Sequence, residues 1–199
     1  MKPLSFLLKR LGNQLGDPIG FYNGLRNESY KPAFLFFVQV TLFISMVTPV
    51  VNLFGLESTD FSASYQAQIT AYNLVKINLL PVYGASAYLI EPVLIFVFSI
   101  AILVLMTLFI HLIYRMIGGK GKILNAWKAA CYGTGPCLLG GFLPYIALFA
   151  GFYSFAMQFY LGPTTLYDAR QGRSIVIFVV LIASTFIEML LRKTTAGLW

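Results

Sequence analysis

Charged residues are scarce in this chain of 199 residues. They make up 11% of it, whereas a soluble globular domain carries about 25%. The runs 32–56, 92–114 and 129–167 contain no Asp, Glu, Lys or Arg at all. Because one crossing of a bilayer needs about 20 apolar residues, each run is long enough to enter a membrane. The composition therefore predicts an all-α, polytopic membrane protein and excludes a soluble domain or a secreted disulfide scaffold.

Residues that usually carry enzyme chemistry are scarce as well. The chain has one His, two Cys and seven acidic residues, and it contains neither a G-x-S-x-G nor an H-E-x-x-H sequence. A single His excludes a bis-His haem and a His-rich metal site within one chain. Cys131 and Cys137 would lie about 9 Å apart along a helix and on different faces, which disfavours a disulfide. We predict no catalytic residues, no metal and no cofactor.

Positive charge exceeds negative charge by seven and lies at the ends of the apolar runs. That placement is typical of contacts with anionic lipid headgroups and not of nucleic-acid binding. The turn Gly118–Lys122 looks like a phosphate-binding loop, but a P-loop needs Gly at position 116 and Ser or Thr at 123, where the chain has Met and Ile. We predict headgroup contacts for four side chains: Arg115, Lys120, Lys122 and Lys128.

Five membrane-spanning helices account best for the apolar runs, at about 33–55, 89–115, 124–141, 143–162 and 174–191. The longest run is divided because one straight helix over it would be about 58 Å long, nearly twice the hydrocarbon thickness. With five spans and the N-terminus inside, the inner segments hold 11 Lys and Arg residues and the outer segments hold 3. The positive-inside rule therefore predicts a cytosolic N-terminus. Four spans would have the same charge count, so length rather than charge favours five.

The N-terminal segment 1–31 precedes the membrane domain at 32–193. Its leucines recur at helical spacing, at Leu4, Leu7, Leu8, Leu11 and Leu15, and Gly16-Asp17-Pro18 ends the pattern. This periodicity predicts an amphipathic helix, which lies either in the membrane interface or against the cytosolic face of the protein itself. A second interfacial helix is expected at about 65–80.

Small residues recur every four positions in the third predicted span, at Ala129, Gly133, Cys137 and Gly141. Such repeats let another helix backbone approach closely, and Gly151 continues them in the fourth span. Pro136 is expected to kink the third span, and Pro144 lies close to the break before the fourth. We predict a packing interface that either closes the bundle of this chain or receives a helix of a partner.

His111 and Glu188 are candidates for a ligand or proton site, because ionisable residues inside a membrane are functional candidates. His111 lies four residues before Arg115, within about one helical turn of the interface. Glu188 precedes Arg192 by four residues, which is the favourable order for an ion pair along a helix. An interfacial or locally paired role is the alternative for both residues.

A pattern of small residues and prolines runs through the second half of the chain, at Gly118-Gly119-Lys120-Gly121, Ala126, Ala130, Tyr132-Gly133, Pro136, Leu138-Leu139 and Pro144. With Asp17-Pro18 and Phe21-Tyr22, it resembles the Yip1 domain family, best over 115–191 and loosely over 17–55. The resemblance implies five spans, a cytosolic N-terminus and a non-catalytic role as an adaptor or membrane-shaping protein. The chain lacks the long polar N-terminus of the eukaryotic members linked to Rab-type GTPases. It is more similar to short prokaryotic members, so a prokaryotic cytoplasmic membrane is the expected location.

Three functions are compatible with these patterns. We favour a non-catalytic integral membrane protein that acts through protein and lipid contacts, with other membrane subunits or a second copy as partners. One alternative is an accessory subunit of a larger respiratory or photosynthetic complex, which the small-residue stripe and His111 would suit. Another is a small solute or ion transporter that uses Pro136, Pro144, Glu91, His111 and Glu188.

Overall fold

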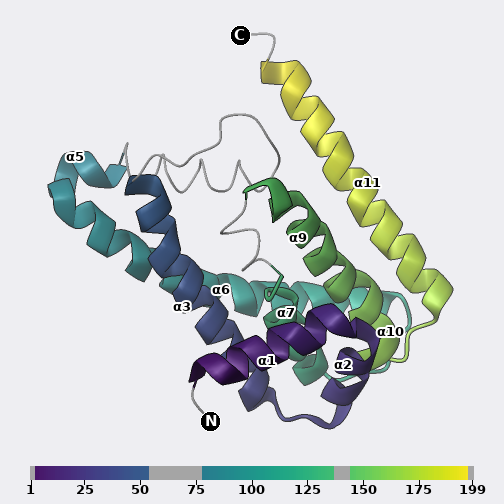
Figure 1. Cartoon of the computed structure of the whole chain (residues 1–199). Helices are drawn as coiled ribbons and strands as arrows, with labels where there is room; N and C mark the ends of the chain where they lie inside the picture. Colours follow the sequence, from purple (N-terminus) through teal and green to yellow (C-terminus); the bar gives the residue numbers. More distant parts are fainter. Residues whose placement is uncertain (1–2, 54–77, 137–143, 197–199) are drawn as a thin grey trace.

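The computed structural model describes residues 3–53, 78–136 and 144–196, and these residues form helices and turns with no strand among them (Figure 1). The predicted all-α fold class is confirmed. Most of the helix expected at 65–80 lies outside the described residues, as do Cys137 and Gly141.

Two short helices open the chain, α1 (Pro3–Gly16) and α2 (Pro18–Gly24). Asp17 separates them, and its carboxylate caps α2 by accepting the Gly20 N–H at 2.9 Å. Pro18 is the first residue of α2, where its fixed φ favours the helix and its missing N–H costs nothing. The one-turn helix η1 (Leu25–Asn27) then leads toward the first long helix.

The long apolar helices are α3 (Tyr30–Leu53) and α6 (Ala87–Met116), the latter entered through α5 (Leu80–Tyr83) and η3 (Gly84–Ser86). By length and composition, two segments of the described chain could cross a membrane, Tyr30–Val47 and Leu80–Met116. In the most apolar 18-residue stretch of the second segment, only 17% is buried inside the protein. Most of its apolar surface is therefore open to the surroundings of the protein.

Helix α7 (Ile123–Gly133) is shorter than the helix expected at 124–141. It ends at Gly133, and a turn covers 134–136, so Pro136 lies after the helix and does not kink it. The expectation that Pro136 lies inside the helix and kinks it is wrong, because the helix ends before it. Proline cannot donate to the carbonyl four residues back, and its ring clashes with that carbonyl. Alone, α7 measures about 16 Å, roughly half the hydrocarbon core.

The remaining helices are α9 (Pro144–Ala156), the π-helical turn η4 (Met157–Leu161), α10 (Gly162–Leu166) and α11 (Gln171–Ala196). The first three follow one another without a break, close to the predicted fourth span. Within α11, Gln171–Ile187 is apolar but shorter than a crossing requires. The described helices thus establish two candidate crossings and not the five that the sequence predicts.

Helices α3, α6 and α7 pack against one another, and η4 joins them to α9, α10 and α11. The core between these helices is apolar and includes Phe36, Val40, Leu103, Ile110, Ala129 and Met157. Helices α1, α2 and α10 lie together at one end, the lower end in Figure 1, and the chain ends at the opposite end. We call α1, α2, η1, α10 and the turn 117–122 the base.

Charge is concentrated at the base. Apart from Glu91 in α6, every charged residue whose side chain the structure describes belongs to the base or to segments beside it. Ten are basic and three are acidic: Lys9, Arg10, Arg26, Lys31, Arg115, Lys120, Lys122, Lys128, Arg170 and Arg173 against Asp17, Glu28 and Asp168. The described structure therefore has one strongly positive end.

Candidate functional site

The turn 117–122 at the base is built around Tyr167, which lies between α10 and α11. The Tyr167 hydroxyl donates to the Lys122 carbonyl at 2.8 Å, and the Tyr167 carbonyl accepts the Lys120 N–H at 2.7 Å. The same hydroxyl also hydrogen-bonds His111 Nδ1. Because a phenol has one proton and Lys122 receives it, the network assigns the His111 hydrogen to Nδ1. Burial raises the pKa of Tyr167 to about 12.

The glycines of this turn are explained by the Tyr167 ring. A Cβ atom at Gly119 would lie 2.8 Å from Tyr167 Cβ, and one at Gly121 would lie 2.6 Å from the ring. Gly118 adopts a φ of 87°, a region that residues with a side chain rarely enter. The Gly-Gly-Lys-Gly sequence thus lets the backbone pass close to a buried tyrosine.

Replacing Tyr167 with Phe is expected to loosen the turn while leaving its ring contacts in place. The two hydroxyl bonds, to Lys122 and His111, are lost, which costs about 1–2 kcal/mol of unfolding free energy. Faster hydrogen exchange at the amides of 118–122 would measure this. In the wild-type protein, the contribution of Tyr167 to the unfolding free energy is complete below pH 10. It falls as the pH rises to about 12, because in that range the phenol ionises in the unfolded chain and not in the folded protein. Unchanged exchange in the variant would contradict the anchoring role.

Basic side chains surround the turn. Arg115, Lys120 and Lys122 are exposed, the position that the predicted headgroup contacts require. Arg173 Nη1 donates to the Ile117 carbonyl at 3.2 Å, so the start of α11 is tied to the same turn. These side chains form an exposed cationic surface over a backbone that Tyr167 holds in place.

Lys128 has a different environment from the one the sequence indicates. It is 3% exposed, and its Nζ donates to the carbonyls of Leu25 at 2.6 Å and of Arg26 and Glu28 at 3.2 Å each. The predicted headgroup contact of Lys128 is therefore wrong. A buried ammonium requires acceptors, and the carbonyls at the end of η1 supply them. Lys128 instead fixes the N-terminal segment to α7.

A polar node connects the N-terminal segment to α7. Arg10 of α1 forms an ion pair with Glu28, and the Tyr132 hydroxyl of α7 donates to Glu28 Oε2 at 3.1 Å. The Arg10 guanidinium lies 5.7 Å from the centre of the Tyr132 ring, a cation–π distance. With Lys128, these three residues form what we call the polar node. Each charged group of the node therefore has a hydrogen-bond or ion-pair partner within the protein.

Gln14 anchors the second half of α1. Its side chain is fully buried, and Nε2 donates to the Tyr132 carbonyl at 2.6 Å. The Tyr153 hydroxyl of α9 donates to the Gln14 carbonyl at 3.0 Å. The N-terminal helix thus packs on its own protein, as one of the two sequence-based alternatives states, while other parts of its surface stay exposed.

The predicted small-residue interface is used inside the chain at the positions that the structure describes. A Cβ atom at Gly133 would lie 2.5 Å from Gln158 Cδ of η4, and the Ser154 hydroxyl donates to the Gly133 carbonyl. A Cβ atom at Gly162 would lie 3.4 Å from Ala129 Cβ. Gly151 differs, because it is exposed and a Cβ atom there would meet nothing within 4 Å.

The turn η4 supplies a carbonyl for a further contact. The Tyr114 hydroxyl of α6 donates to the Gln158 carbonyl, within the π-helical stretch. Gly162 leaves room for this ring, since a Cβ atom there would lie 2.9 Å from Tyr114 Cζ. The hydroxyl of Tyr114 thus binds a backbone carbonyl inside the π-helical stretch. This contact joins α6 to η4.

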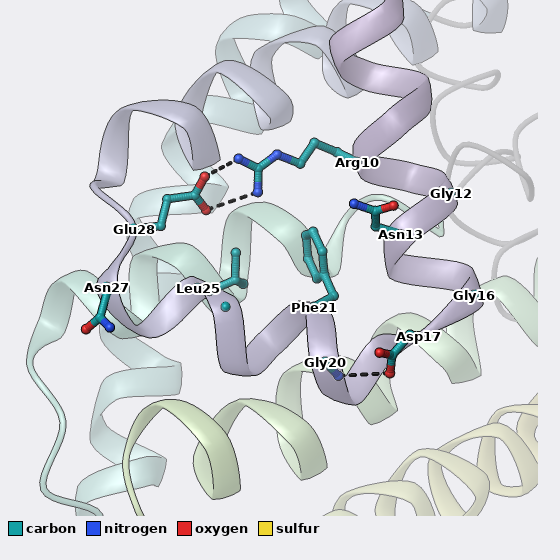
Figure 2. A pocket seen from close by; sticks show the side chains of 11 residues that line it. Arg10, Gly12, Asn13, Gly16, Asp17, Gly20, Phe21, Leu25, Asn27 and Glu28 are labelled. Atoms are coloured by element: carbon teal, nitrogen blue, oxygen red, sulfur yellow. Dashed lines mark hydrogen bonds and ion pairs between the residues drawn. The ribbon is translucent and has the colours of Figure 1, made fainter.

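A groove of about 820 Å³ lies between α1 and α2 (Figure 2). The ion pair of Arg10 and Glu28 lies on one side of it, and the capping bond of Asp17 to Gly20 lies on another. Four glycines spaced four residues apart line it: Gly12, Gly16, Gly20 and Gly24. The groove is an open feature of the base, and its lining combines charged and polar side chains with Phe21, Leu25 and the glycines.

The candidate ligand residues do not come together. His111 serves the Tyr167 turn, and Glu91 is buried in α6. Glu188 is part of α11, but its side chain lies outside the described part of the structure. Within the described residues, no three His, Cys, Asp or Glu side chains gather in a way that could hold a metal ion.

Sequence reasoning missed Glu28, Gln14 and Tyr167. Glu28 carried a usable signal, because it is the one acid in the positive stretch between Arg26 and Lys31. Gln14 and Tyr167 carried none, since their partners lie far away in the chain. Tyr167, for example, contacts Lys122 across 45 positions.

No protein-family model, curated protein or solved structure matches this chain. Its function is therefore inferred from its own contacts, burial and charge.

Proposed function

We propose that this chain is a non-catalytic integral membrane protein that acts through protein and lipid contacts, in the manner of the Yip1-like proteins it resembles. The carrying observation is the contrast between the bare apolar surface of α6 and the charged base. Leu89, Val97 and Leu105, spread along α6, are 77%, 57% and 65% exposed. Contiguous apolar surface of this kind is costly in water and is satisfied by lipid or by a partner helix.

The proposed arrangement has five crossing segments with the base in the cytosol. Helices α3, α6 and α11 would be three of them, and the continuous helical stretch 144–166 a fourth. The segment that begins with α7 would be the fifth. Ten basic side chains against three acidic ones favour the cytosolic side for the base, which would place α1 at the inner interface.

Purification in mild detergent from native membranes tests the function. We expect a colourless particle that contains this chain, alone or with similar small subunits, and retains anionic lipid. Replacing Arg115, Lys120 and Lys122 together with Ser is expected to reduce the retained anionic lipid several-fold, because the exposed cationic surface at the turn is lost. Mass spectrometry of the intact particle measures both composition and lipid.

The double variant Arg192→Ser, Lys193→Ser is the control, since it removes positive charge from the far end of α11. It should retain lipid as the wild type does. Equal lipid loss in both variants would contradict a headgroup role for the turn. A stoichiometric set of larger redox subunits, or a pigment absorption band, would replace the proposal by an accessory subunit of an energy-transducing complex.

A further inference from the structure

Helix α1 has one face that is committed to the protein. Leu7 and Gln14 are buried, and at about 100° per residue they point in nearly the same direction. Helix α1 contacts α2 and α3, and Gln14 on its inner face reaches the carbonyl of Tyr132. The remaining circumference of α1 is divided between two chemically different flanks.

The first flank is apolar and is largely exposed in the described structure, although Leu11 at its edge packs against the core. Leu4, Leu8 and Leu15 are 63%, 58% and 39% exposed, although a small helix at a protein surface usually turns leucine inward. With the half-buried Leu11, they fall within a sector of about 60° around the helix axis. We call these four residues the leucine flank.

The second flank is polar and faces the groove between α1 and α2. Gly12, Asn13 and Gly16 line this groove, and Figure 2 shows the Asn13 side chain on the side of α1 that is turned toward α2. By helical rotation, Asn13 lies about 140° away from Leu8. Lys9, which is exposed, is on the groove side of the leucine flank by the same rotation.

The contacts of Gln14 set the depth of α1 relative to the spanning helices. A Cβ atom at Gly135 would meet Gln14 Oε1 and, at 2.9 Å, Phe36 Cζ of α3, so these three residues lie together. Phe36 is six positions beyond Tyr30, where the candidate crossing begins, or about 9 Å along the helix. Amphipathic helices in a membrane interface lie about 5–10 Å into the boundary between headgroups and acyl chains.

The charges of α1 suit an anionic lipid surface. The described part of α1 has no acidic residue, and the charge of Arg10 is neutralised by Glu28. Lys9 is left as an exposed cation on the groove side, and the base around it is strongly positive. The ion pair of Arg10 and Glu28 has no net charge, so placing it at the membrane interface costs little. The exposed ammonium of Lys9 is attracted to headgroup phosphates.

We propose that α1 is a membrane-embedded helix that lies in the plane of the cytosolic leaflet. The leucine flank inserts among the acyl chains of anionic lipids, and the groove flank faces the cytosol. This inference rests on the proposed function, because it requires the base to lie at a membrane. Its consequence is that the protein holds a rigid apolar wedge in one leaflet, fixed to the bundle by Gln14 and the polar node.

Single labels on opposite flanks test the orientation. In full-length protein carrying Cys131→Ala and Cys137→Ala, a fluorophore is attached at Leu8→Cys or Asn13→Cys. Both side chains are exposed, so neither label disturbs the core. The proteins are reconstituted in phosphatidylcholine vesicles with or without phosphatidylglycerol, and quenching by brominated acyl chains is compared with quenching by aqueous iodide.

In vesicles with phosphatidylglycerol, the label at position 8 should be quenched several-fold more by brominated lipid than the label at position 13. Iodide should show the reverse order. Because α1 is fixed to the bundle, the lipid quenching at position 8 should persist without phosphatidylglycerol. In the mixed vesicles, brominated phosphatidylglycerol should quench the label at position 8 more than an equal amount of brominated phosphatidylcholine, because the positive base gathers anionic lipid around α1. Equal quenching by the two brominated lipids would overturn the preference for anionic lipid.

A label at Val97→Cys in α6 separates this inference from the proposed function. Val97 is 57% exposed in the middle of α6 and should be quenched by brominated lipid in every membrane. If position 97 meets lipid while position 8 meets iodide, the orientation of α1 is wrong and the membrane assignment stands. If position 97 itself is open to iodide, the proposed function fails.

Discussion

Replacing Gly133 with Leu is expected to break the packing of α7 on η4 and to lower the unfolding free energy by about 3 kcal/mol or more. Gly133 is buried, and even a Cβ atom would lie 2.5 Å from Gln158 Cδ. The larger side chain must displace Gln158 and the bond from Ser154 to the Gly133 carbonyl. The effect is measured by heating the protein in detergent and recording the temperature at which its single peak in size-exclusion chromatography is lost.

Gly151→Leu is the matched control for this variant. Gly151 belongs to the same sequence pattern but is exposed, and a Cβ atom there would meet nothing within 4 Å. We expect its unfolding temperature to stay within about 2 °C of the wild type, since surface substitutions away from special features change stability little. If both variants unfold alike, the small residues of α7 do not carry the packing that the structure shows.

Replacing Lys128 with Met is expected to release the N-terminal segment from α7. The methionine has similar length but no donor, so three carbonyls at Leu25, Arg26 and Glu28 lose a charged partner. Hydrogen bonds to a charged group contribute about 1.5–3 kcal/mol, and a loss of about 3 kcal/mol is expected for the group as a whole. Hydrogen exchange should accelerate by about two orders of magnitude through α1 and α2.

Lys122→Met is the control, because Lys122 is an exposed lysine near the start of the same helix. Its exchange rates in α1 and α2 should match those of the wild type. Lys128→Arg should restore the charge only in part, since a planar guanidinium cannot place one atom among three converging carbonyls. Wild-type exchange in Lys128→Met would show that Arg10, Glu28 and Gln14 hold the N-terminal segment without it.

The apolar helices were the most predictable part of the fold. A crossing of lipid requires a long uncharged run, and such runs are visible without any partner. The expected segments 89–115 and 174–191 correspond closely to α6 (Ala87–Met116) and α11 (Gln171–Ala196). The length of these helices can be predicted because a long uncharged run is a property of the segment itself, although some of its residues pack against other helices.

The third predicted span shows where sequence reasoning is limited. Spacing identified the small residues but not their partners in the same chain, which proved to be η4 at Gly133 and the start of α10 at Ala129. Spacing also placed Pro136 inside a helix, whereas the helix stops at Gly133. Whether a proline kinks or ends a helix depends on what can satisfy the freed carbonyls, and that is a tertiary matter.

Composition and hydropathy by themselves determined the class of this protein: helical, apolar and positively charged at one end. They did so because lipid and headgroup potential act on each residue independently of its neighbours in space. Only the tertiary structure decided that Lys128 is buried, that Tyr167 shapes the glycine turn and that α1 keeps one leucine flank exposed. Each of these depends on a contact between segments far apart in the chain, and the sequence around one residue does not indicate which distant residue it will contact.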